Sequence, residues 1–149
     1  MRSVRLSAGI AVFLVLAGMT MTGAVRAQGS AFSVSDDTTT ESSKSVCSVT
    51  VTLSPASSDL ASVQYKTDSG YGPTRAKKAT IREDFEYQEG TLDFAPGTTT
   101  QTVNVKIKGD NFNEKPARKE YFTVDLLAPE GATIADGQGI CTIVEQKHG

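Results

Sequence analysis

The chain has 149 residues, of which 38% are hydrophobic and 7% aromatic, and its 17 acidic residues outnumber its 15 basic ones. This length supports one domain with a single core beyond any leader segment. The net negative charge argues against a nucleic-acid partner, because binding to phosphates requires a basic surface.

The first 27 residues read as a secretory signal peptide. A short basic start precedes an apolar stretch over residues 6–24, and residues 25–27 offer the small or aliphatic side chains that a signal peptidase recognises. A membrane anchor is the alternative, which the polar and glycine residues within the stretch disfavour. Removal of Arg2, Arg5 and Arg26 leaves 12 basic against 17 acidic residues, a formal charge of −5. We therefore expect a single mature domain over residues 28–149, secreted or periplasmic and without a membrane span.

Alternation of apolar and polar side chains predicts about seven β-strands in this domain. In chain order they cover residues 32–34, 45–53, 61–67, 91–94, 99–108, 120–127 and 139–145. Turn signals such as Ser54-Pro55 and Pro96-Gly97 separate them. One inward and one outward face at this spacing is typical of an all-β, two-sheet antiparallel immunoglobulin-like sandwich. A closed barrel is disfavoured because the predicted strands differ in length.

Two cysteines, Cys47 and Cys141, lie near opposite ends of the mature domain. Cys47 shares a strand face with Val49, and Cys141 shares one with Ile143, so both point toward the core. In an exported chain such a pair usually forms a disulfide. We expect a Cys47–Cys141 bridge, with two buried reduced thiols as the alternative.

A basic segment over residues 70–78 connects the third and fourth predicted strands. Its candidate contacts for an acidic protein or cell-surface partner are Tyr71, Arg75, Lys77 and Lys78. The alternative is an exposed loop without a binding role, since solvated runs of charge are common.

Several motifs follow one another in a set order over most of the mature chain. They are Tyr65-Lys66-Thr67-Asp68-Ser69-Gly70, then Asp84-Phe85, then Gly90-Thr91-Leu92-Asp93-Phe94-Ala95-Pro96-Gly97, then Glu120-Tyr121-Phe122-Thr123-Val124-Asp125-Leu126, and last Thr142-Ile143. This ordered set resembles the Calx-beta module, which occurs in the regulatory domains of sodium/calcium exchangers and in secreted bacterial proteins. The resemblance covers residues 32–144 and implies the same sandwich fold.

The resemblance also implies a calcium site at one end of the sandwich. The matching metal positions are Asp84, Asp110, Glu114, Glu120 and Glu145, with Asp36 or Asp37 as a contribution from the first strand. Calcium takes about six to eight oxygen ligands. The family's acidic run is reduced here to Asp110-Asn111, and Lys147 follows the last acid, so we expect weak binding. The alternative is a solvated rim of acids that holds no metal.

Little in the chain favours catalysis. The one histidine, His148, lies next to the C-terminus, and neither cysteine has a neighbouring histidine that would activate it. A carboxylate pair such as Asp84 with Glu114 lacks an aromatic-lined cleft for a sugar, because the chain has no tryptophan. The sequence therefore favours a non-enzymatic module that binds calcium weakly and mediates protein or surface interaction, as in cell adhesion. The alternative is a calcium-independent interaction or structural domain stabilised by the disulfide.

Overall fold

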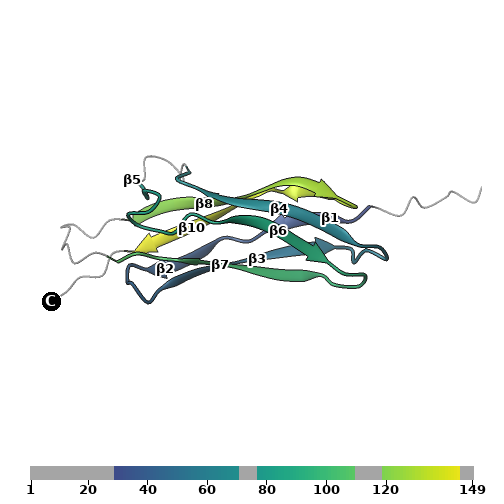
Figure 1. Ribbon diagram of the computed structural model, residues 1–149, viewed down its shortest axis with the longest axis horizontal. Helices are drawn as coiled ribbons and strands as arrows, with labels where there is room; N and C mark the ends of the chain where they lie inside the picture. Colours follow the sequence, from purple (N-terminus) through teal and green to yellow (C-terminus); the bar gives the residue numbers. More distant parts are fainter. Residues whose placement is uncertain (1–28, 71–76, 110–118, 145–149) are drawn as a thin grey trace, which may run out of the picture.

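The computed structural model describes residues 29–70, 77–109 and 119–144, and all regular secondary structure within these ranges is β-strand. The strands are β1 (Ala31–Val34), β2 (Asp37–Thr40), β3 (Val46–Ser54), β4 (Ala61–Asp68), β5 (Lys77–Lys78), β6 (Glu89–Phe94), β7 (Thr100–Lys106), β8 (Lys119–Glu130), β9 (Thr133–Asp136) and β10 (Gln138–Val144). They form an elongated two-layered sandwich (Figure 1). Within the described ranges no helix has the length and apolar character needed to cross a bilayer.

One sheet has the strand order β7-β3-β1-β9, and the other has the order β2-β10-β8-β4-β6, with β5 paired to β8. The predicted all-β two-sheet sandwich is therefore confirmed. The described strands exceed the seven predicted, and three of their pairings are parallel: β1 with β9, β2 with β10, and β5 with β8. The other pairings are antiparallel, as predicted.

Two of the parallel pairings, β1 with β9 and β2 with β10, arise because the first chain segment crosses from one sheet to the other between β1 and β2. Three side chains at this crossover accept hydrogen bonds from strand backbones. Thr50 N donates to Ser35 Oγ at 3.0 Å, Ser48 N to Asp37 Oδ2 at 2.7 Å, and Ile140 N to Asp36 Oδ1 at 2.8 Å. These polar residues satisfy backbone groups that lose ladder partners where the segment changes sheets.

The core lies between the two sheets and is built from the inward faces that the alternation predicted. Phe32 and Phe94 pack at one end with their ring centroids 5.3 Å apart, and Phe85 stacks on Phe122 at 4.1 Å near the other. Further inward side chains, all almost fully buried, are Val49, Val51, Leu53, Val63, Val103, Val105, Ile107 and Val124. Burial of this apolar surface is the main stabilising contribution to the fold.

The predicted Cys47–Cys141 disulfide is present, and it joins β3 in one sheet to β10 in the other. Both cysteines are completely buried, and their Cα atoms lie 6.3 Å apart. This separation is within the usual range for a disulfide. The bond is therefore a covalent link across the core.

Side-chain amides bond the backbone along the side of the sandwich where β6 and β7 form the sheet edges. Gln88 Nε2 donates to the carbonyl oxygen of Asn104 at 3.0 Å, and Gln101 Nε2 donates to the carbonyl oxygen of Asp93. Glu86 N also donates to Lys106 O at 3.0 Å. These bonds occupy carbonyl groups with which an added strand would otherwise pair.

Candidate functional site

A tight loop over residues 79–85, termed here the Asp84 loop, holds Asp84 at one end of the sandwich. Thr80 N donates to Asp84 Oδ2 at 2.6 Å, and Asp84 N donates back to Thr80 O at 2.9 Å. Lys108 N donates to Asp84 O at 2.8 Å, which ties the loop to the chain beyond β7. The buried ring of Phe85 then anchors the loop against Phe122. Asp84 is thus fixed by hydrogen bonds on one side and by core packing on the other.

Glu120 lies beside this loop, at the start of β8. It is in the inward phase of the strand, and only 5% of its surface is exposed. Burial raises the pKa of Glu120 above its ordinary value, because it disfavours the charged form. The Lys77 ammonium opposes this rise, whereas the neighbouring Asp84 carboxylate adds to it. The structure therefore brings together two of the predicted metal residues, Asp84 and Glu120.

Lys77 makes a charged contact with Glu120 of this pair. Its Nζ lies 2.5 Å from Glu120 Oε1, and the parallel pairing of β5 with β8 sets Lys77 opposite Glu120. Sequence reasoning treated Lys77 as a loop residue for an external partner and missed this internal ion pair. The contact joins residues 43 positions apart, as their numbers show, and no local pattern indicates it.

The predicted metal residues Asp110, Glu114 and Glu145 lie outside the described residues, as do Tyr71 and Arg75 of the basic segment. Described residues that flank the segments 71–76, 110–118 and 145–149 lie at the site end. Val144 pairs with Lys119 beside Glu120, and a Cβ on Gly109 would lie 2.8 Å from the Ser42 Cα. In the ranges that the structure describes, no group of three or more His, Cys, Asp or Glu side chains is arranged to hold a metal.

The acids of the first chain segment, Asp36, Asp37 and Glu41, lie at different places in the fold. Asp36 and Asp37 accept hydrogen bonds from strand backbones at the crossover, which gives them a structural role. Glu41 follows β2 directly, and its N–H donates to Val144 O at 2.9 Å. Glu41 is thus the acid of this segment that lies at the site end. Its position beyond the crossover depends on the pairing of β2 with β10, which the sequence does not reveal.

The donor set fits calcium in kind, because carboxylate oxygens are the ligands that this cation prefers. Asp84 and Glu120 alone supply fewer oxygens than the roughly six to eight that calcium takes. Among the described residues, the structure thus brings together an acidic pair and an ammonium group.

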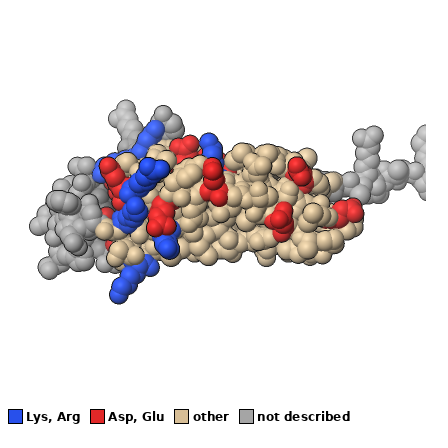
Figure 2. All heavy atoms as spheres, viewed as in Figure 1, with Lys and Arg blue, Asp and Glu red and all other residues tan. Residues whose placement is uncertain are grey.

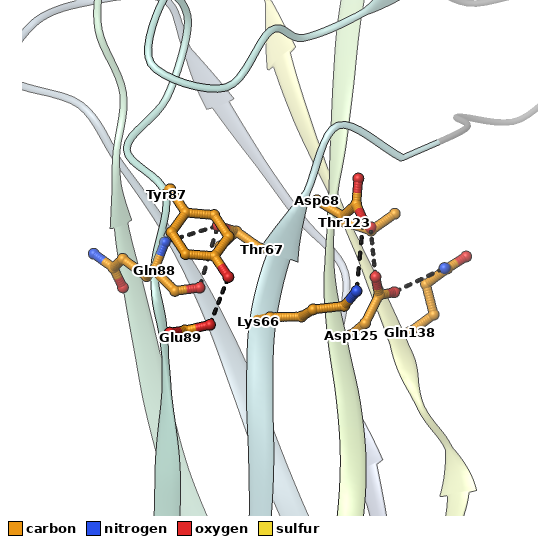
Figure 3. Close-up of polar contacts among 9 residues, drawn as sticks. All are labelled: Lys66, Thr67, Asp68, Tyr87, Gln88, Glu89, Thr123, Asp125 and Gln138. Atoms are coloured by element: carbon orange, nitrogen blue, oxygen red, sulfur yellow. Dashed lines mark hydrogen bonds and ion pairs between the residues drawn. The ribbon is translucent and has the colours of Figure 1, made fainter.

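A second polar cluster lies on the outer face of the six-stranded sheet (Figure 3). Asp125 accepts hydrogen bonds from Gln138 Nε2 at 2.8 Å and from Thr123 Oγ1 at 3.2 Å, and Lys66 Nζ lies 3.7 Å from Asp68. A shallow cavity of about 240 Å³ is lined by Asp68, Gly70, Lys78, Thr123, Asp125 and Gln138. Because Asp125 has partners within the sheet, these bonds stabilise the sheet face.

Charge is unevenly distributed over the face drawn in Figure 2. Lys and Arg side chains gather with acidic ones over the half that carries the site, whereas the other half shows acidic side chains only. The half of this face that carries the site is thus rich in both signs of charge.

Comparison with known proteins gives consistent matches. A family model described as the Calx-beta domain matches residues 27–146. Sodium/calcium exchanger 2 of Rattus norvegicus, Mus musculus and Homo sapiens is 35% identical over 78 residues, which is 52% of this chain and 7% of the exchanger. This chain therefore spans a small part of the curated relatives that it matches.

Two solved structures show the same architecture. The apo-form Calx CBD1 domain has a TM-score of 0.68 and 22% identity, covering 80% of this chain and 100% of that one. The calcium binding domain CBD12 of CALX1.1 has a TM-score of 0.66 and 25% identity, covering 78% of this chain and 46% of that one.

Proposed function

This chain belongs to the Calx-beta domain family, and we propose that it is a non-enzymatic, exported module. In this proposal the module binds calcium weakly at the Asp84 end of the sandwich, and the bound ion determines how the module contacts a protein or surface partner. One observation carries the calcium part of the proposal. The almost buried carboxylate of Glu120 lies next to Asp84, so two like charges are held together where water screens them little. A divalent cation stabilises such a pair. One of the similar solved structures is also described as a calcium binding domain.

The non-enzymatic part rests on the chemistry of the described groups. Both cysteines are consumed in the disulfide, so neither is a thiol nucleophile. Glu120 contacts a lysine inside the protein, and the cavity beside Asp68 and Asp125 is lined by no aromatic side chain. We infer a binding role from this set of groups.

A calcium titration of thermal unfolding tests the proposal. With a Kd of about 1 mM, 10 mM calcium adds about 1.4 kcal/mol to the free energy of unfolding. For a domain of this size, this corresponds to a rise in Tm of about 5 °C. Asp84→Asn should abolish most of the rise. Asp93→Asn is the matched control, because it makes the same change on an exposed strand position toward the other end.

The controls decide between specific and general effects of the ion. Magnesium chloride at equal ionic strength separates calcium binding from screening of surface charge. An unchanged Tm of the wild-type protein in 10 mM calcium would contradict the calcium part of the proposal. An equal response of the Asp84→Asn and Asp93→Asn variants would contradict the location of the site.

The calcium-independent alternative is favoured by one observation, the contact between Lys77 and Glu120, which neutralises part of the acidic pair without a metal. In that case the domain acts through its end loops or through a sheet edge, and β2 and β9 are the candidate edges because side-chain amides bond the backbone along the β6 and β7 side. Deletion of residues 71–76 would test the basic segment, with retention on an acidic surface as the readout. Unchanged retention would remove this segment from the interaction.

Export is the remaining part of the proposal, and it is supported by the pattern of residues 1–27 and by the buried disulfide. Expression of the full chain in a secreting host, followed by mass determination, would test it. A mature chain that begins near Gln28 is expected. A product that retains residues 1–27 and both cysteines as thiols would contradict export.

A further inference from the structure

Two exposed aliphatic side chains lie at opposite ends of the sandwich. Val46 is 39% exposed at the start of β3, at the site end, and Leu60 is 63% exposed just before β4, at the other end. Together with Tyr87 they are the large hydrophobic side chains that are exposed within the described ranges. A single exposed aliphatic side chain is ordinary, so its surroundings decide whether it marks a contact surface.

Val46 is surrounded by basic side chains. It lies on the outer face of the four-stranded sheet, because its neighbour Cys47 is buried in the core, and it pairs with Lys106 of β7. Lys108 follows on the same face, and its Nζ donates to Arg82 O at 2.8 Å, which brings the Asp84 loop alongside. The basic patch, as defined here, consists of Val46 with Lys44, Arg82, Lys106 and Lys108, all of them exposed.

The basic patch keeps a net positive charge. Glu83 and Glu86 lie beside it in the chain, and with them included its formal charge is +2. No salt bridge to another described residue engages Lys44, Arg82 or Lys106. Their charges are therefore available to a partner.

Leu60 has the opposite surroundings. Ser62, two residues further on, pairs with Asp93 of β6 on one side and with Glu130 of β8 on the other. A Cβ on Gly131 would lie 2.8 Å from Leu60 O, so the end of β8 lies against this residue. The acidic patch, as defined here, consists of Leu60 with Asp59, Asp93 and Glu130, all of them exposed.

The half of the molecule that carries the acidic patch is without basic side chains among its described residues. The ranges 29–34, 51–65, 90–101 and 126–137 contain neither Lys nor Arg. Figure 2 shows the same separation on the face drawn, where blue side chains are confined to the site half. The two patches thus present opposite charge around one exposed aliphatic side chain each.

The placement of the patches determines what a second copy can do. The basic patch is centred on the outer face of the four-stranded sheet, whereas Ser62 and Asp93 lie on the outer face of the six-stranded sheet at the opposite end. Because the patches face opposite ways, a two-fold pair of copies cannot use both at once. A contact between them is heterologous, and repetition of such a contact gives an open series.

We propose that the basic patch of one copy docks on the acidic patch of a second copy, so that copies of this chain associate head to tail in an overlapping series. Val46 and Leu60 lie at the centre of the contact, and the charges around them set its direction. The contact is small, so the association is weak and transient, and salt weakens it further. The inference goes beyond the proposed function and does not depend on calcium.

Sedimentation equilibrium in EDTA tests the association. At low salt the weight-average mass should rise with protein concentration, to about three times the monomer mass when the total concentration is about twice the Kd of an open series. A closed dimer does not exceed about twice the monomer mass. In about 0.5 M sodium chloride the mass should fall toward that of the monomer. A protein that stays monomeric at low salt, or whose mass levels off at the dimer, would overturn the proposal.

Two charge reversals test which surfaces are in contact. Lys106→Glu removes the basic patch and Glu130→Lys removes the acidic one, so each variant alone should stay close to the monomer mass. Each variant retains one intact patch, so their equimolar mixture should regain association. Lys119→Glu is the matched control, because it reverses an exposed lysine at the site end on β8, in the other sheet. It should associate as the wild-type protein does.

Circular dichroism checks that the variants are folded, which the exposure of the three side chains favours. A mixture that stays monomeric would overturn the pairing of the two patches. An equal loss of association in Lys119→Glu and Lys106→Glu would assign the effect to net charge and likewise overturn it. Because every measurement is made in EDTA, failure of this inference leaves the proposed calcium function standing.

Discussion

The Cys47–Cys141 bond should be one of the largest single contributions to the stability of this domain. The bond closes a loop of 94 residues between its two cysteines. Loop closure of this length in the unfolded chain corresponds to about 4.7 kcal/mol at 25 °C. This is a large part of the roughly 5–15 kcal/mol by which domains are stable. The reduced protein should therefore lie close to the limit of folding.

The assay compares the oxidised protein with the same chain after reduction in denaturant and refolding in the presence of a phosphine reductant. The two species have the same side chains, so the comparison isolates the covalent link from the packing of the sulfur atoms. With a slope of about 3 kcal/mol per molar guanidinium, the midpoint of unfolding should fall by about 1.5 M on reduction. The Cys47→Ala/Cys141→Ala variant should fall further, because it also leaves small cavities between the sheets.

A shift below about 0.3 M between the oxidised and reduced proteins would refute this reasoning. It would mean that the cross-link restricts the unfolded chain far less than loop-closure entropy requires. The alanine variant then shows how much of any remaining loss is due to packing. A shift seen only in that variant would assign the whole effect to the buried side chains.

Two further predictions concern the site end and its surroundings. The hydrogen bond from Tyr87 Oη to Glu89 Oε2, 2.6 Å long, raises the pKa of the Tyr87 phenol above its ordinary value of 10.0, with the charges of Glu89 and Asp68 acting in the same direction. The contribution of this hydrogen bond to stability should be present below pH 10 and be lost as pH rises through the folded-state pKa. Ultraviolet titration should show one phenol that is absent from the Tyr87→Phe variant and that titrates at lower pH in the Glu89→Gln variant. An unchanged titration midpoint in Glu89→Gln would contradict Glu89 as the cause of the raised pKa. The Phe85→Ala variant should lose about 3–5 kcal/mol of unfolding free energy and show faster hydrogen exchange of the Lys108 amide, which donates to Asp84 O. The Phe94→Ala variant should lose a similar amount of unfolding free energy without this local effect on exchange. Equal exchange of the Lys108 amide in the two variants would contradict the anchoring role of Phe85.

The fold was largely predictable because a half-buried strand alternates with a period of two. Cys47, Val49 and Phe122 all face inward, as the pattern indicated. The division of the first segment into β1 and β2 was not predictable, since the polar residues at the crossover read as a turn and its pairing partners are distant in sequence. Strand β5 was read as loop because two adjacent lysines carry no alternation, and only pairing with β8 makes them a strand.

The site was predictable in part. The family motifs led to Asp84 and Glu120, and the structure brings these two together. Asp110, Glu114 and Glu145 remain predictions, because they lie outside the described residues. The role of Lys77 could not be read from its neighbours, since it depends on a contact with a residue far along the chain. Opposite charges brought together by tertiary structure leave no periodic signal in a sequence.

The glutamines that bond the β6 and β7 backbones have a consequence for how copies of this protein behave when crowded. A neighbouring molecule that approaches this side meets amide side chains already committed to Asn104 and Asp93. Growth of a continuous sheet from one copy to the next would first have to break these bonds. We therefore expect that copies of the module do not join edge to edge along this side, and that any continuous sheet between copies would form at the opposite edges, β2 and β9.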